Sequence, residues 1–276
     1  MGGTTAGQRW REALDEWRIP QAIRDGAAAS PWTLPVGMFA ARARGQLAAP
    51  SGVSYRVAME ALPPDGTVLD IGAGAGAASL ALRARAGSIT AVDENDDMLA
   101  VFADLAATAQ VPARTVIGTW PEVAGDVAPA DVVVCHHVLY NVPDLGPFVT
   151  ALTAHARARV VVELTAHHPL SSLNPLWRML HGIERPTRPT ATDAIEVISS
   201  TGVRPRWKAW NRPVTQDGME YPELVAATCR RLCLGPERLG DVEAALRQLG
   251  VSPDRPYLGG PTRDLVTVWW DPSAPT

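Results

Sequence analysis

Three glycines at alternate positions, Gly72, Gly74 and Gly76, follow a short apolar run in the segment VLDIGAGAGAASLAL (68–82). Glycine lets the backbone approach a ligand closely and tolerates positive φ angles. A strand, a glycine-rich loop and a helix at the carboxyl edge of a parallel sheet form a typical site for nucleotide-like ligands. The segment therefore predicts such a site.

Two acidic residues bear on which ligand the loop holds. The spacing of Gly72, Gly74 and Ala77 fits the G-x-G-x-x-A pattern of dinucleotide sites. However, Asp70 precedes the first glycine by two residues; its carboxylate would repel a pyrophosphate and suit a ligand with an ammonium and a sulfonium cation. Asp93 ends the next apolar run and can accept hydrogen bonds from ribose hydroxyls, a role that nicotinamide sites share. Asp70, and not Asp93, therefore separates the two ligands.

The elements that would position these residues alternate along the chain. Continuous apolar runs separated by helical patterns are typical of a parallel sheet buried on both faces. Strands are expected over 67–71, 88–92, 114–117, 131–135, 158–164, 204–210 and 264–270, and helices over 75–86, 94–109, 145–156, 173–180 and 192–201, with one or two more within 220–249.

The first 62 residues favour helices. Trp10, Leu14 and Trp17 form one helical stripe, so a helix is expected over 8–17. Residues 30–35 indicate a turn, and a further helix is expected over 54–62, before two prolines.

Composition excludes several classes of protein. The chain has 276 residues, of which 46% are hydrophobic and 20% charged, so a buried core is expected. The net charge of −4 disfavours nonspecific electrostatic binding to nucleic acid. Three cysteines cannot form a disulfide framework. Without a signal-peptide pattern or a membrane-length apolar run, a soluble cytoplasmic protein is expected.

Three segments together resemble the class I S-adenosylmethionine-dependent methyltransferases: LDIGAGAG (69–76), AVDENDDML (91–99) and ADVVVCHHVLYNVPDL (130–145). The resemblance covers about residues 66–166. It implies an α/β, Rossmann-like fold with a seven-stranded, mostly parallel sheet in order 3-2-1-4-5-7-6, the last strand antiparallel. We expect an N-terminal helical extension or cap (1–62) and a methyltransferase domain (63–276) with inserted lid segments near 166–190 and 211–260.

The resemblance also implies the cofactor, S-adenosyl-L-methionine, and residues that contact it. The backbone of Gly72, Gly74 and Gly76 would contact its methionine part, and Asp70 would organise the loop or receive the ammonium. Asp93 would bind the ribose. The other candidates are Glu94, Met98, Thr119, Trp120 and Cys135. The family often has Gly-Asp-Ala after the third strand, where this chain has Gly-Thr-Trp. Thr119 could hydrogen-bond to the adenine and Trp120 could stack on it, or Trp120 could belong to the core.

His136 and His137 follow the fourth strand, where this family often places a base. A neutral imidazole near pH 7 suits proton abstraction from an acceptor. One of the two should face the cleft, since neighbouring side chains diverge; the alternative is that both only shape the loop. His167 and His168, with His136, His137, Cys135 and Glu163, could suggest a metal site, but no typical ligand spacing occurs, and we predict no metal.

The acceptor is predicted to be a small molecule, methylated on O or N. The fourth strand lacks the following Asn/Asp-Pro-Pro-Tyr/Phe motif of many nucleic-acid and protein N-methyltransferases. The added segments contain aromatic residues, some of which should line a cavity: Trp10, Trp17, Trp32, Phe39, Tyr55, Trp177, Trp210 and Tyr221. The first helix could close over the cofactor with Trp10 or Trp17. Possible carboxylate partners are Arg11, Arg42, Arg56 and Arg178.

Two other functions stay open. One is an NAD(P)-dependent oxidoreductase, although the only lysine, Lys208, has no tyrosine four residues before it. The other is a non-catalytic binding protein on a methyltransferase fold, because fold alone does not establish activity. The sequence fixes neither the acceptor nor the oligomeric state.

Overall fold

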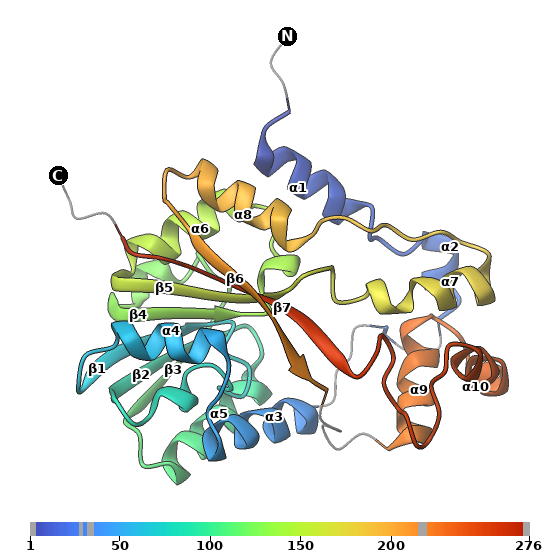
Figure 1. Cartoon of the computed structure of the whole chain (residues 1–276), viewed down its shortest axis with the longest axis horizontal. Coiled ribbons are helices and arrows are strands. Elements are labelled where there is room, and N and C mark those ends of the chain that lie inside the picture. The colour runs from blue at the N-terminus through green and yellow to red at the C-terminus, as the bar shows by residue number, and fades with distance from the viewer. Residues whose placement is uncertain (1–3, 28–29, 32–35, 215–219, 273–276) are drawn as a thin grey trace.

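The computed structural model describes residues 4–27, 30–31, 36–214 and 220–272. Within these residues lies a seven-stranded sheet in order β3-β2-β1-β4-β5-β7-β6 (Figure 1). The strand β7 runs in the opposite direction to the other six. The predicted class of fold, strand order and last-strand direction are confirmed. The strands are β1 (Gly66–Ile71), β2 (Ala86–Asp93), β3 (Ala113–Ile117), β4 (Ala130–His136), β5 (Ala156–Thr165), β6 (Arg206–Pro213) and β7 (Thr262–Trp270).

The apolar runs form the inner strands because both faces of the sheet are covered. In β4, which lies between β1 and β5, each residue from Val132 to Cys135 is at most 1% exposed. An alternating pattern would put polar side chains into one of the two cores, so the run is continuous. The edge strand β3 is mostly exposed, in keeping with its more polar sequence.

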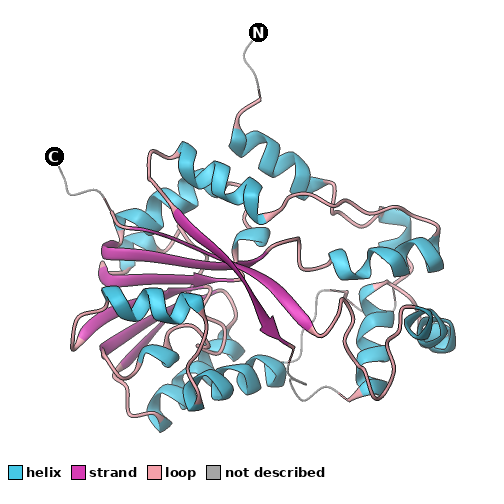
Figure 2. Ribbon diagram, viewed as in Figure 1, coloured by secondary structure: helices cyan, strands magenta, loops and turns pink. Residues whose placement is uncertain are grey.

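Helices form a layer on each face of the sheet (Figure 2). One core contains side chains from α1 (Ala6–Asp15), α6 (Leu145–Ala154) and α8 (Ala191–Ser200). The other contains side chains from α3 (Val36–Ala48), α4 (Val53–Ala61) and α5 (Asp96–Thr108). The helices α3 and α4 precede the sheet in sequence, yet α4 packs directly on β4, β5 and β7.

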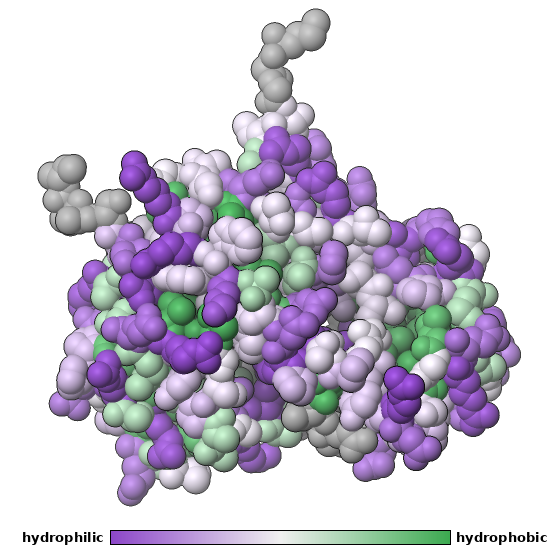
Figure 3. Space-filling model, viewed as in Figure 1, coloured by the Kyte–Doolittle hydropathy of each residue, from purple (hydrophilic) through white to green (hydrophobic). Residues whose placement is uncertain are grey.

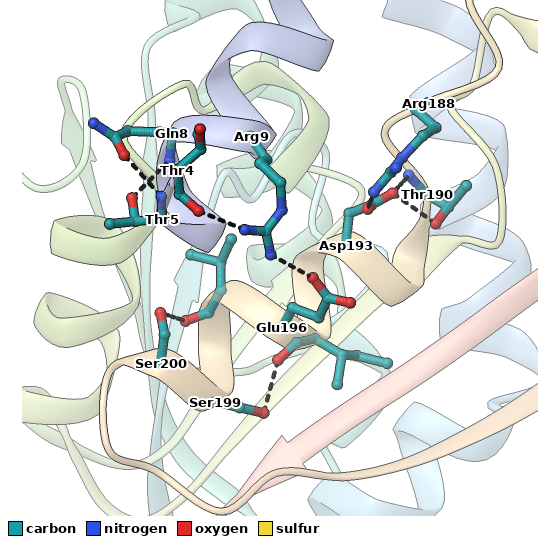
Figure 4. Close-up of polar contacts among 12 residues, drawn as sticks. Thr4, Thr5, Gln8, Arg9, Arg188, Thr190, Asp193, Glu196, Ser199 and Ser200 are labelled. Carbon is teal, nitrogen blue, oxygen red and sulfur yellow. Dashed lines mark hydrogen bonds and ion pairs between the residues drawn. The ribbon is translucent and has the colours of Figure 1, made fainter. Parts of the chain in front are cut away.

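The first helix, α1, packs against α8 and does not cover the edge of the sheet where the strands end. It begins at a capping box, in which Gln8 N–H donates to Thr5 Oγ1 (3.2 Å) and Thr5 N–H donates to Gln8 Oε1 (2.7 Å). Arg9 forms an ion pair with Glu196 of α8, 3.0 Å away (Figure 4). The helix therefore starts and ends two residues earlier than predicted, with the predicted stripe turned inward at Trp10.

A small helical cluster stands beside the sheet, at the right of Figure 1. It consists of α7 (Asn174–His181), α9 (Tyr221–Arg231) and α10 (Leu239–Gln248), with the short α2 (Gln21–Asp25) against it. These helices share a core of their own that includes Leu176, Val225 and Val242. The division of the chain into an extension and a domain with inserted segments stays a prediction.

One predicted helix is absent. Residues 75–86 form turns and a short 3₁₀ helix, η1 (Leu80–Leu82), instead of an alanine-rich α-helix. The Ser79 hydroxyl is bonded to Asp70 of β1, and β2 starts at Ala86. This tether and the short distance to the next strand leave no room for a regular helix, so tertiary context overrides the helix propensity of alanine.

None of the described helices combines the length and the hydropathy that a bilayer crossing requires. Hydrophilic side chains are spread over most of the face seen in Figure 3, with smaller hydrophobic patches between them. Such a distribution is ordinary for a protein surface.

Candidate active site

A cavity of about 690 Å³ opens at the carboxyl ends of β1, β2, β4 and β5, a size typical of small-molecule sites. Helices α3 and α4 and the end of β6 complete its walls. Ten of the predicted site residues line it: Asp70, Gly72, Gly74, Asp93, Glu94, Met98, Thr119, Trp120, His136 and His137. The cavity therefore brings the predicted ligand loop and the predicted histidines together.

The glycine loop is shaped by left-handed backbone. Gly72 has φ 67°, and a Cβ there would lie 2.3 Å from Cγ2 of Val138. Gly72 N–H and Ala73 N–H both donate to Val92 O (2.9 and 3.0 Å), which holds the loop on β2. Gly76 does not line the cavity. A Cβ there would lie 2.5 Å from Phe102, so this glycine is required by core packing and has no direct ligand contact to offer.

Asp70 lies at the floor of the cavity and is 1% exposed. Its Oδ2 accepts a hydrogen bond from Ser79 Oγ at 2.6 Å. Burial raises the pKa of Asp70 to about 7, although the Ser79 bond opposes the shift. The negative charge that the sequence suggests is therefore only half developed at neutral pH, and a nearby cation would complete it.

Asp93 ends β2 and ties the loop to it. Its Oδ2 accepts from Gly74 N–H (2.8 Å) and its Oδ1 from Asn95 N–H (2.9 Å). A carboxylate has about four acceptor positions, so both oxygens can still accept from a ligand hydroxyl. Sequence reasoning gave Asp93 a ligand role only; the structure adds that it shapes the loop.

The far end of the cavity is formed by residues that follow β2 and β3. Glu94, Met98 and Thr119 contribute to its wall. Trp120 also borders the cavity, but its ring belongs to the core: it is 6% exposed and packs edge-on against His155 at 4.8 Å. Of the two predictions for Trp120, core packing describes the ring.

Cys135, like Gly76, is a predicted site residue that does not line the cavity. It is fully buried within the core on the α6 side and does not line the cavity. Burial raises the pKa of its thiol far above the usual value. The resemblance implied a cofactor contact for Cys135, but alternation along β4 directs its side chain into the core.

Both histidines line the cavity, whereas the sequence predicted one. That prediction assumed an extended chain, in which neighbouring side chains point apart. The strand ends at His136, and His137 has a φ of 61°, so the chain turns and directs the second ring to the same side. Burial lowers the pKa of His136 to about 4 and also lowers that of His137, which keeps both rings neutral at pH 7.

A buried carboxylate, Glu163 of β5, anchors this end of the cavity. Its Oε2 accepts from the Ser54 hydroxyl of α4. Its Oε1 lies 3.1 Å from His137 Nε2, 3.7 Å from Arg42 Nη2 and 3.6 Å from Arg212 Nη1. Burial acts to raise the pKa of Glu163, but the hydrogen bond from His137, the charge interactions with His136 and His137 and the bond from Ser54 together outweigh it and hold the pKa well below its usual range. Glu163 is therefore ionised.

The Nε2 atom of His137 faces two partners. It lies 2.6 Å from Arg42 Nη2 as well as 3.1 Å from the Glu163 carboxylate. A guanidinium only donates and a carboxylate only accepts, so a neutral ring can satisfy one of them at a time. By contrast, Nε2 of His136 is buried and has no hydrogen-bond partner among the described residues.

The aromatic residues divide between cavity and core. Phe39, Tyr55 and Trp210 line the cavity. The expectation that Trp10 or Trp17 closes over the cofactor is wrong, because α1 packs on α6 and α8. Trp10 instead stacks on Tyr140, and Trp17 stacks on His168.

The remaining aromatic and basic candidates lie elsewhere. Trp17 and Trp177 border a small second pocket, and Tyr221 belongs to the core of the helical cluster. Trp32 lies outside the described residues. Arg42 reaches the cavity, whereas Arg56 is exposed, and Arg11 and Arg178 form surface ion pairs with Asp144 and Glu184. Among the described residues, no group of histidine, cysteine and acidic side chains is arranged to hold a metal ion.

Sequence reasoning did not predict that Ser54, Arg42, Glu163 and Arg212 form one cluster. Arg42 and Glu163 were named for other roles, and Ser54 and Arg212 were not named. The available signal was Glu163 itself, a lone acid in the apolar run ARVVVEL. A buried charge in a central strand requires partners. The partners come from residues 42, 54 and 212, and no local pattern connects those positions.

Comparisons with known proteins agree with the fold. Residues 68–158 match the family model described as a methyltransferase domain. No protein among those with curated descriptions matches the chain. The YcgJ protein of Bacillus subtilis is 17% identical and superimposes with a TM-score of 0.53 over 80% of this chain and 99% of that one.

Two further solved structures have similar values. A protein of Bacillus halodurans described as a candidate methyltransferase is 13% identical, with a TM-score of 0.54 over 81% of this chain and 100% of that one. A candidate sarcosine dimethylglycine methyltransferase of Galdieria sulphuraria is 15% identical, with a TM-score of 0.52 over 83% and 86%. At such identities the likeness is one of fold. Together with the match over residues 68–158, it shows that the chain contains a methyltransferase domain and shares the fold of these structures.

Proposed function

We propose that the protein is an S-adenosylmethionine-dependent methyltransferase that methylates an oxygen or nitrogen atom of a small molecule. The observation that carries the proposal is one shared cavity. It holds the glycine loop and Asp93 at one end and a histidine–carboxylate cluster at the other. A ligand loop and groups that can accept a proton therefore meet where two molecules would react.

The residues present fit the cofactor. A side chain at Gly72 would collide with Val138, so the loop presents its backbone to the cavity at this position. Asp70 would face the ammonium, Asp93 the ribose hydroxyls, and Glu94, Met98 and Thr119 the adenine. When bound, the cofactor supplies a methyl group on a sulfonium, an electrophile that needs no metal or further activation.

We assign proton removal to His136. Its Nε2 has no hydrogen-bond partner among the described residues, and it is neutral at pH 7. Such a nitrogen can accept the proton that an acceptor hydroxyl or amine loses as it is methylated. His137 is a positioning residue, because its Nε2 lies against Arg42 and Glu163 and one of them always occupies it.

The acceptor would lie between α3, α4 and β6. Phe39, Tyr55 and Trp210 give this part of the cavity aromatic walls, which suit a flat apolar molecule. The net charge of −4 and the missing Asn/Asp-Pro-Pro-Tyr/Phe motif favour a small molecule over nucleic acid.

Thermal unfolding with S-adenosylhomocysteine tests the cofactor. We expect S-adenosylhomocysteine to raise the melting temperature and NADP to leave it unchanged, because only S-adenosylhomocysteine presents an ammonium to Asp70. The Asp93→Ala variant should lose most of the shift, whereas Asp126→Ala, a change outside the cavity, should keep it. A shift with NADP alone would favour the oxidoreductase. Cofactor binding without methyl transfer into any fraction of a metabolite extract would favour the non-catalytic alternative.

A further inference from the structure

A serine that follows the glycine loop holds the carboxyl group at the floor of the cavity. Ser79 Oγ donates to Asp70 Oδ2 at 2.6 Å. Both residues are buried: Asp70 is 1% exposed and Ser79 is 0% exposed. Among the described residues, no other side chain donates a hydrogen bond to this carboxyl group. Because Ser79 does not line the cavity, any effect it has on a ligand must pass through Asp70.

The Ser79 hydroxyl does not take the partner that lies nearest along the chain. A serine or threonine in helical backbone often donates to the carbonyl four residues before it. Thr150, Thr153 and Ser199 do so in this protein, bonding to Gly146 O, Val149 O and Ile195 O. Ser79 also has helical backbone angles, yet its hydroxyl donates to a carboxylate on β1, nine residues earlier. The contact is therefore a tertiary one, between the end of a strand and the turn beside it.

The surroundings of Asp70 otherwise oppose a negative charge there. Burial raises its pKa, and the charge of Asp93 at the end of β2 acts in the same direction. On β4, the Cys135 thiol stays protonated because burial raises its pKa well above the usual value, and His136 is neutral above its pKa of about 4. Among the described residues, no positive charge offsets these effects. Only hydrogen bonds from the hydroxyl and the backbone of Ser79 lower the pKa of Asp70.

A hydroxyl in this place favours one charge state of the carboxyl group. A hydrogen bond to an ionised acceptor is stronger than the same bond to a neutral one. The Ser79 bond therefore stabilises the carboxylate more than the protonated acid. It also fixes one of the two oxygens of Asp70, so the group is presented to the cavity in one orientation. Both effects prepare Asp70 to receive a cation.

We propose that Ser79 is a positioning residue for cofactor binding, whose hydroxyl orients the Asp70 carboxyl group and stabilises its ionised form. This inference rests on the proposed function and concerns the cofactor end of the same cavity. The charge of Asp70 attracts the ammonium group of the ligand, so the Ser79 bond determines the pH range in which the cofactor binds. The competing possibility is that Ser79 only fixes the course of the chain after the glycine loop.

The test compares the full chain with Ser79→Ala by calorimetric titration with S-adenosylhomocysteine from pH 6 to pH 8.5. Loss of one charge-assisted bond should move the midpoint of the affinity curve about one pH unit higher. The variant should therefore bind about 10-fold more weakly than the unchanged chain at pH 6, and within about 2-fold of it at pH 8.5. Ser199→Ala removes a hydroxyl that bonds within α8, outside the cavity, and should leave the curve unchanged.

Urea unfolding of the free protein gives a second measurement that needs no ligand. The free energy of unfolding should fall with rising pH until folded Asp70 has lost its proton, near pH 7 in the unchanged chain. Ser79→Ala should extend this fall to about pH 8.

The two measurements separate the outcomes. An equal loss of affinity at every pH, as a purely structural role predicts, overturns the proposal, and so does a pH range that is unchanged in both measurements. Should Ser79→Ala misfold, Ser79→Cys, whose thiol is a weaker donor, is measured in the same way and should shift both curves in the same direction. Failure of the unchanged chain to bind S-adenosylhomocysteine refutes the proposed function instead, while the unfolding curves still show whether Ser79 acts on Asp70.

Discussion

The Asp70→Asn variant should make the free protein more stable and its cofactor binding weaker. In the free protein, burial raises the pKa of Asp70 to about 7 from an ordinary value of 3.8. The folded state therefore binds a proton that the unfolded state has released between these values, and the free energy of unfolding falls as the pH rises through this window. At pH 8 the ionised carboxylate costs the fold at most about 4 kcal/mol. Asparagine has no such charge and can still accept the bond from Ser79.

Cofactor affinity should change in the opposite direction. A ligand ammonium favours ionised Asp70, so a protonated carboxyl must lose its proton before the ligand binds tightly. With a pKa of about 7, the ionised fraction is near one tenth at pH 6 and nine tenths at pH 8. The dissociation constant of S-adenosylhomocysteine should thus be about 10-fold higher at pH 6 than at pH 8. His136, with a pKa of about 4, does not titrate in this range.

Calorimetry at both pH values, in buffers of different ionisation enthalpy, measures the affinity and the proton release together. Asp70→Asn should bind weakly at both pH values, with no pH dependence. Urea unfolding of the free proteins at pH 8 supplies the stability comparison, and Asp126→Asn, a change outside the cavity, is the matched control. A flat affinity between pH 6 and 8 in the unchanged chain, or an Asp70→Asn variant that binds as the unchanged chain does, would refute the reasoning.

Three further predictions concern other parts of the cavity. Glu163→Gln should lower the free energy of unfolding by about 3 kcal/mol in urea, because two guanidinium groups lose their buried counter-charge; an unchanged midpoint would contradict this. His136→Asn should reduce the incorporation of labelled methyl groups into a metabolite extract by roughly 10²–10⁴-fold with S-adenosylhomocysteine affinity retained, and an undiminished rate would remove the base from this position. Gly72→Ala should weaken S-adenosylhomocysteine binding at least 10-fold, as its Cβ would lie 2.3 Å from Val138; wild-type affinity would show that the loop adapts.

The sheet and its ligand loop were predictable because their signals are local. A strand buried on both faces must be a continuous apolar run, and DVVVC in β4 is one. The positive φ angles of Gly72 and Gly74 follow from the residue type that tolerates them. The region after the loop was not predictable in this way, because the bond from Ser79 to Asp70 depends on where β1 lies.

The acceptor side was hidden from the sequence for the same reason. Ser54, Glu163 and Arg212 lie 109 and 49 positions apart, and only the folded chain shows that they surround one point. The prediction that one histidine faces the cavity was wrong because the φ of 61° at His137 turns the second ring to the same side. Neither feature follows from spacing, since both depend on how strand ends and added helices meet.

Glu163 also connects the helices α3 and α4 to the central strand β5. An ionised carboxylate that is 5% exposed requires partners, and two of them, Ser54 and Arg42, come from helices that precede the sheet. If α3 and α4 moved away, the carboxylate would keep Arg212 and His137 but lose the hydroxyl bond and one positive charge. Opening this side is therefore opposed electrostatically in the free protein.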